Sequence, residues 1–320
     1  MKWKWVIIAA FLTAMLALPV VATAEIIANF EGRAGTLDVD GYKGKTGLGW
    51  SGAWVEKGSG TGSVVGTLMT PTTPGYTAFD SDNDQYLRIR TTLTSGTNYK
   101  GSINRNYTHS SGDVDFTQPY RVSLSVRPED LTNWEQSATN DSFRIFDILG
   151  TNSYDRSATS TRFYVSANGG PTSPYNSTKH CWLVSDGTSS ITTYVYIADG
   201  HIYDFVIDVF PDTKTWDVTI TDRDFALADI NPAYYDGVTT RPKATYTKEG
   251  LNWYAAGATG TNAPTAISVA VYEGIATGGA LGKYNTMSVD DIRIAEIPEP
   301  TSVAMGLGLL LAGLMVRRRK

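Results

Sequence analysis

Three aspartates at alternate positions form the clearest candidate for metal chemistry in this 320-residue sequence. Asp80, Asp82 and Asp84 stand in the stretch FDSDNDQYLRI. Loops bind Ca²⁺ by presenting alternate side-chain oxygens, because the ion takes about six to eight oxygen ligands. Gln85 occupies the place of the turn glycine of an EF-hand, and no Glu follows at the closing position. The stretch is therefore either a calcium site or an acidic, solvated turn ahead of a strand.

Tryptophans are the second kind of candidate, since an aromatic ring combines an apolar face with a polar group and can stack on a sugar. Trp134, in the polar context LTNWEQS, and Trp253, in GLNWYAA, are the candidate glycan-stacking residues. Trp50 and Trp54 stand four positions apart, so a strand would place both rings on one face. We expect this second pair to seal the core of the domain.

Nucleophilic and zinc chemistry have little support in the sequence. Cys181 is the only cysteine, so no intramolecular disulfide can form, and its neighbours in HCWLV predict a buried thiol. His109, His180 and His201 come with no recognisable nucleophile or zinc motif. We assign no catalytic residue.

The elements that position these residues are predicted to be strands. In YRVSLSVRP, from Tyr120, apolar residues alternate with polar ones. The stretch IYDFVIDVFPDTKTWDVTITD predicts a hairpin with its turn at 211–214. In MSVDDIRIAEI the apolar parity changes, which predicts a bulge near Asp290 and Asp291. Residues 230–258 are interpreted as long loops at the rim of a sheet.

About a dozen short strands with frequent turns predict an all-β, two-sheet antiparallel β-sandwich. The early segment TGLGWSGAW, the long hairpin and the closing strand SVDDIRI resemble those of the concanavalin-A-like and laminin-G-like jelly rolls. The resemblance implies one jelly-roll domain over residues 25–297.

Sugar-cleaving members of that superfamily carry Glu-x-Asp-x-x-Glu on one strand, because retaining cleavage needs two carboxyl groups about 5–5.5 Å apart. No such run occurs in this chain. Asp147 and Asp208 stand singly in strand-like stretches, where we interpret them as outward or edge residues. We therefore expect a protein that is not an enzyme, while carboxylates converging from different strands leave a hydrolase or lyase open.

The first 24 residues have the pattern of a secretory signal helix. Lys2 and Lys4 precede an apolar run over 6–18, and Ala22-Thr23-Ala24 fits the small-residue cleavage site. Cleavage by signal peptidase is expected before Glu25.

Residues 298–320 form a second targeting segment. Pro298, Glu299 and Pro300 precede an uncharged run over 301–316 and the terminal cations Arg317, Arg318, Arg319 and Lys320. This order resembles the PEP-CTERM sorting signal of Gram-negative bacteria. The resemblance implies a single hydrophobic helix that holds the precursor in the inner membrane, with its cations on the cytoplasmic side, until an exosortase processes it. An ordinary anchor that the mature protein keeps is the alternative.

The net charge argues against one class of binding partner. Residues 25–297 hold 21 Lys and Arg against 31 Asp and Glu, a formal charge of about −10, which disfavours nucleic acid. We expect a non-enzymatic protein at the cell surface or in the extracellular matrix, in contact with extracellular polysaccharide and with Ca²⁺ as its one candidate cofactor. The alternatives are a glycan-active hydrolase or lyase and a purely structural coat or adhesive protein.

Overall fold

The computed structural model describes most of the region between the two predicted targeting segments. The described residues are 25–28, 30, 50–60, 62–69, 78–79, 85–93, 98–107, 114–130, 142–145, 161–162, 165–168, 181–187, 189–230, 232, 235, 241–255, 266–274 and 284–297.

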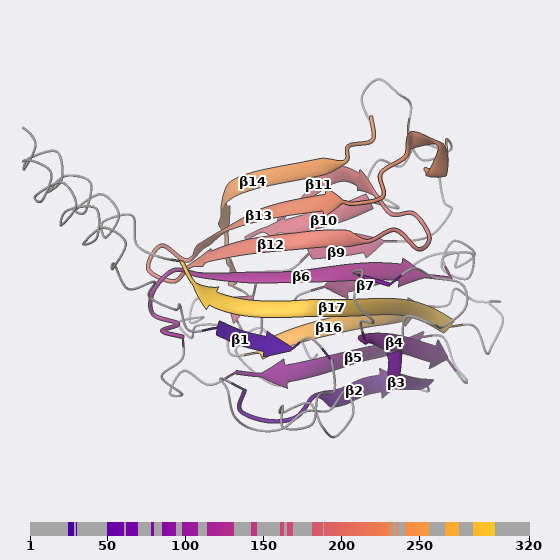
Figure 1. Ribbon diagram of the computed structural model, residues 1–320, viewed down its shortest axis with the longest axis horizontal. Helices are drawn as coiled ribbons and strands as arrows, with labels where there is room; N and C mark the ends of the chain where they lie inside the picture. The colour runs from indigo at the N-terminus through magenta and orange to yellow at the C-terminus, as the bar shows by residue number, and fades with distance from the viewer. Residues whose placement is uncertain are drawn as a thin grey trace, which may run out of the picture.

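Two antiparallel sheets make up the fold (Figure 1). Sheet I follows the order β14 (Thr245–Asn252), β13 (Thr215–Asp222), β12 (Tyr203–Phe210), β6 (Tyr120–Glu129), β17 (Tyr284–Glu296), β4 (Tyr86–Leu93) and β3 (Gly62–Met69), with β1 (Glu25–Ala28) paired to β17. Sheet II follows the order β11 (Ser189–Tyr196), β10 (Cys181–Asp186), β9 (Val165–Asn168), β7 (Ser142–Ile145), β16 (Ala266–Gly274), β5 (Asn98–Asn106) and β2 (Val55–Gly60). A small third ladder joins β8 (Thr161–Arg162) to β15 (Tyr254–Ala255), and η2 (Leu227–Asp229) is a single 3₁₀ turn. The predicted all-β, two-sheet antiparallel sandwich is confirmed.

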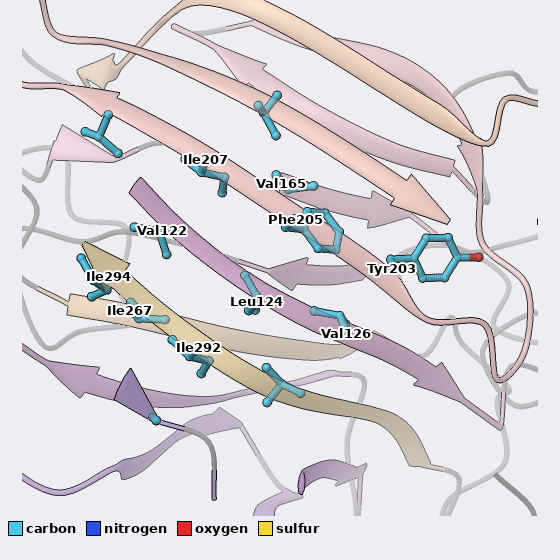
Figure 2. Packing of buried hydrophobic residues seen from close by; sticks show 14 of the residues in the cluster. Val122, Leu124, Val126, Val165, Tyr203, Phe205, Ile207, Ile267, Ile292 and Ile294 are labelled. Carbon is cyan, nitrogen blue, oxygen red and sulfur yellow. The ribbon is translucent and has the colours of Figure 1, made fainter. Parts of the chain in front are cut away.

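The core lies between the two sheets. In both strands of the predicted hairpin, buried residues alternate strictly with more exposed ones, so one face of each strand points into the core. In β12 every odd position from Tyr203 to Val209 is buried, and in β13 the even positions from Trp216 are buried. The β12–β13 register pairs Phe205 with Ile220, so apolar faces meet across the hairpin. Figure 2 shows Val122 of β6 and Ile207 of β12 among side chains that fill the space in front of sheet II.

One contact joins the sheets most directly. Trp182 of β10 packs edge-on against Tyr203 and Phe205 of β12, with ring centroids 5.4 and 5.3 Å apart, and all three side chains have no exposed surface. The Tyr203 hydroxyl donates to the Tyr196 carbonyl at 2.9 Å and accepts from the Ala198 N–H at 2.8 Å. The hydroxyl therefore ties β12 of sheet I to the end of β11 in sheet II.

The predicted bulge in the last strand is confirmed. The β17–β6 register shifts between Asp290 and Arg293, and Asp291 adopts a left-handed backbone with φ of 51°. Its N–H bonds the Asp290 carboxylate at 2.8 Å. The shift returns Ile292 to the buried face that Val289 occupies, and thus keeps both halves of β17 in the core.

The prediction of long loops over 230–258 is wrong in part, because β14 runs from Thr245 to Asn252 within that region. β14 is an edge strand with one neighbour in its sheet, so most of its side chains are exposed and its sequence lacks apolar alternation. Tyr246 and Leu251 alone on this strand pack against the main core cluster.

Residues 1–24 and 298–320 lie outside the described residues, as do their predicted signal and tail helices. None of the helices in the described part of the chain has the length and apolar character needed to cross a membrane.

The inter-sheet contact of Phe205 gives a test of the core. Phe205→Ala should lower the free energy of unfolding by about 3–5 kcal/mol, because it removes buried area and leaves a cavity beside Trp182. The neighbouring Val206 points away from the core and is half-exposed, so Val206→Ala should cost about 1 kcal/mol or less. Urea unfolding of both variants measures the difference, and equal losses would contradict the assignment of faces in β12.

Candidate functional site

Most of the residues that the sequence singled out lie outside the described part of the chain. Asp80, Asp82, Asp84 and Trp134 lie outside the described residues, as do Pro298, Glu299, Pro300 and the terminal cations Arg317, Arg318, Arg319 and Lys320. Within the described ranges no group of three or more His, Cys, Asp or Glu side chains is arranged to hold a metal ion. The calcium site therefore stays a prediction.

The prediction that Trp253 is an exposed stacking ring is wrong. Its side chain is 8% exposed and belongs to the main core cluster. The indole N–H donates to the Thr215 carbonyl at 3.1 Å, and the backbone N–H donates to the Lys214 carbonyl at 3.1 Å. These bonds turn the ring into the sandwich directly after β14 ends.

The expectations for the other tryptophan pair and for the cysteine are confirmed. Trp50 and Trp54 are each 2% exposed, with ring centroids 6.1 Å apart, and they help to close the core. Cys181 is fully buried, and burial raises the pKa of its thiol to about 12. A thiol that stays protonated at neutral pH is not a nucleophile.

Arginines neutralise several carboxylates on the outer face of sheet I. Asp208 accepts two bonds from Arg121, at 2.6 and 2.8 Å, as expected for an outward residue. Arg223 binds Asp204 at 2.6 Å. The Arg127–Glu129 pair, with 2.9 Å between its charged atoms, is buried. Each of these acids thus has an arginine as its hydrogen-bond partner.

The side of the sandwich where β11 and β14 meet carries a different group of side chains. We name it the tyrosine–lysine edge and define it by Tyr194, Lys243 and Tyr246. The Lys243 ammonium lies 5.5 Å from the Tyr194 ring centroid and 6.0 Å from that of Tyr246. Both rings are half-buried and Lys243 is exposed, so solvent reaches two aromatic rings and a cation together. Figure 1 shows β11 and β14 next to each other at the top of the molecule.

Tyr194 reaches this edge through an irregularity in β11. The β10–β11 register passes from Cys181↔Tyr196 to Leu183↔Thr192, so three residues of β11 lie opposite the single residue Trp182. Tyr194 has a φ of 61°, which is costly for an aromatic residue. The Thr193 hydroxyl fixes the bulge, donating to the Trp182 carbonyl at 2.7 Å and accepting from the Val195 N–H at 3.1 Å. The bulge aims the Tyr194 side chain toward Lys243.

Residues of sheet II fix the positions of Lys243 and Tyr246. The Lys243 N–H donates to the Tyr194 carbonyl at 2.9 Å, which binds the start of β14 to the bulge. Partial burial and the charge of Asp186 raise the pKa of the Tyr246 phenol, so it remains a hydrogen-bond donor. Asp186 itself is fixed by the backbone and side-chain amides of Asn252, which lower the pKa of its carboxyl group. Sequence patterns did not single out these residues, since ITTYVYI reads as an ordinary strand.

His201, which the sequence suggested to be ordinary, takes part in a buried ion pair. Its Nδ1 lies 3.1 Å from both oxygens of Asp222, and its Nε2 lies 3.5 Å from Asp229 Oδ2. Asp224 accepts from the Ile202 N–H at 2.9 Å beside it. With carboxylates at both ring nitrogens, His201 joins the start of β12 to the turn after β13.

The His201 pair predicts a pH dependence of stability. The bond to Asp222, with the charges of Asp222, Asp224 and Asp229, raises the pKa of His201 above its ordinary value of 6.5. A raised folded-state pKa gives stabilisation that is complete below the unfolded pKa and is lost as pH rises through the folded pKa. His201→Asn should remove this loss, as measured by urea unfolding at a series of pH values. Parallel stability curves for parent and variant would contradict the role of the pair.

Comparisons with known proteins give similar structures only. No protein-family model matches the sequence, and a search of curated proteins finds no match. A marine PL-14 alginate lyase from Aplysia kurodai is similar at 9% identity and a TM-score of 0.40, over 72% of this chain and 87% of the lyase. A GH131 beta-glucanase catalytic domain from Podospora anserina is similar at 11% sequence identity and a TM-score of 0.38, over 67% of this chain and 73% of that domain. Basic winged bean lectin is similar at 11% sequence identity and a TM-score of 0.39, over 77% of this chain and 100% of the lectin. Scores this low carry no argument about function, which therefore rests on the side chains of this chain.

Proposed function

We propose that this protein is an exported, non-enzymatic component of the cell surface or extracellular matrix that binds polysaccharide through the tyrosine–lysine edge. The observation that carries the proposal is the arrangement of Tyr194 and Tyr246 around Lys243, with both rings partly open to solvent. A sugar ring has apolar C–H faces and a rim of hydroxyls. Aromatic faces next to hydrogen-bonding groups therefore match both parts of its surface.

The surroundings of the two rings support this proposal. The Lys243 ammonium and the Tyr246 hydroxyl are polar groups that sugar hydroxyls can bond. The rings come from two different sheets, so the site depends on the assembled sandwich. A rigid site of this kind loses little conformational entropy when it binds.

The non-enzymatic part of the proposal is supported by the chemistry of the described acids. Asp204, Asp208 and Glu129 are each bonded to an arginine, and both nitrogens of His201 face carboxylates. Cleavage of a glycosidic bond needs two carboxyl groups that face the substrate, whereas these acids are turned toward an arginine. Release of reducing ends from a bound polysaccharide would overturn this part and favour the hydrolase or lyase.

The proposal of export uses the two targeting segments and the strands that adjoin them. β1 begins at Glu25, directly after the predicted signal cleavage site, and β17 ends at Glu296, two residues before Pro298. These two strands are paired, with Glu25 opposite Ala295. Removal of both segments would therefore leave every described strand whole.

Intact-mass analysis of the exported protein tests the processing. We expect a chain that starts at Glu25 and lacks the residues after the Pro298-Glu299-Pro300 motif, because signal peptidase and an exosortase would act at those points. The inner membrane would then be only a transient partner. A mature protein that keeps Arg317 to Lys320 would contradict sorting by exosortase and indicate an ordinary anchor.

Substitution of Tyr246 tests the binding site. Tyr246→Ala should weaken binding to polysaccharide between about two- and tenfold, because it removes one stacking surface. Thr247→Ala is the matched control, since Thr247 is the next residue of β14 and bonds Thr219 on the outer face of sheet I. Affinity electrophoresis against a panel of soluble polysaccharides measures both variants. Failure of the parent protein to bind any polysaccharide, with or without Ca²⁺, would overturn the proposed function and favour a purely structural coat or adhesive protein.

A further inference from the structure

Lys243 of the tyrosine–lysine edge and the nearby Lys248 differ from the arginines elsewhere in the domain. Arg121, Arg223 and Arg293 each form an ion pair with a carboxylate. None of the ion pairs in the described part of the chain involves Lys243 or Lys248. The Lys243 ammonium instead lies near two aromatic rings, and Lys243 is exposed.

Exposed cations stand close together in the sequence at this edge, although the whole domain is acidic. Residues 25–297 carry 21 cations and 31 acids, yet Arg241, Lys243 and Lys248 are all exposed within one short stretch. Four acids also lie near this stretch. Glu249 stands on the same strand and Asp186 lies across the edge. Asp217 accepts from the Gly250 N–H at 2.7 Å, and the Asp222 N–H donates to the Ala244 carbonyl at 2.9 Å. The amides of Asn252 and, last, the charge of Lys248 lower the pKa of Asp186, so the field of Lys248 is partly offset there. Lys243 is thus the cation best placed to meet an external anion.

We propose that the tyrosine–lysine edge selects acidic polysaccharides, with a uronate carboxylate bound to Lys243 and the sugar rings on Tyr194 and Tyr246. This inference rests on the proposed glycan binding and names its ligand class. An ammonium held against aromatic rings and a carboxylate form a charge-assisted hydrogen bond, whereas a neutral sugar offers only hydroxyls. The repulsion from the distant acids is screened beyond about 8 Å at physiological salt, so the short-range contact decides the selectivity.

A pair of polymers with the same backbone isolates the charge. The full chain is run by affinity electrophoresis in gels that contain polygalacturonate or its fully methyl-esterified form. We expect tighter binding to the acid form, and we expect about 1 M NaCl to remove the difference because the Debye length falls to about 3 Å. Lys243→Gln should weaken binding to polygalacturonate about three- to tenfold and leave binding to the ester unchanged.

Lys214→Gln is the matched control, since Lys214 is an exposed lysine in the β12–β13 turn, and it should change neither affinity. Thermal unfolding checks that both variants are folded. Equal binding to the two polymers, or an equal loss in both lysine variants, would overturn the selection of acidic polysaccharide while the proposed glycan binding stands. Binding to neutral polysaccharides of the panel, without binding to polygalacturonate or to its methyl ester, would also overturn the selection of acidic polysaccharide. Absence of binding to all of them would overturn both proposals.

Discussion

The edge-on packing of Trp182 against Tyr203 and Phe205 is the contact on which the rest of the structure depends. It joins a strand of sheet II to the middle of sheet I, and it buries three large aromatic side chains completely. Aromatic pairs in this geometry contribute about 0.5–1.5 kcal/mol beyond the area that they bury. The contact fixes how β10 and β11 sit over β12, and the Tyr203 hydroxyl extends this connection to the backbone at Tyr196 and Ala198.

The position of Trp182 also has a consequence at the surface. The register of β10 and β11 shifts at this residue, and Thr193 bonds the Trp182 carbonyl to close the resulting bulge. Tyr194 then takes up the left-handed backbone conformation and meets Lys243, whose N–H bonds the Tyr194 carbonyl. The packing of Trp182 in the core thus determines, through the strained residue Tyr194, the shape of the surface that is proposed to bind sugar. His201 holds the turn after β13 in place at the same end of β12.

Sequence reasoning predicted the parts of the fold that depend on local periodicity. The strict alternation of β12 and β13 and the parity change in β17 are visible in the residue types, because burial on one face leaves a period of two. β14 was missed, since an edge strand with exposed Thr, Lys and Glu carries no such period. Trp253 was misassigned because its polar neighbours gave no sign of the two backbone-directed hydrogen bonds that turn it inward. The tyrosine–lysine edge was not foreseeable, as it depends on a bulge and on two strands that are distant in sequence.

Whether a cation of the described residues forms an ion pair depends on where its side chain lies. On the outer face of sheet I, acids and arginines stand on neighbouring strands, so cross-strand pairs such as Arg121 and Asp208 form directly. β14 has no further strand beside it in its sheet, and none of the ion pairs among the described residues involves Lys248 on this strand or Lys243 two residues before it. Ordinary edge strands carry lysine because the charge discourages pairing with another chain. In this chain Lys243, two residues before β14, lies next to the half-buried Tyr194 and Tyr246, so a lysine beside the sheet edge also supplies the cation of a candidate binding surface.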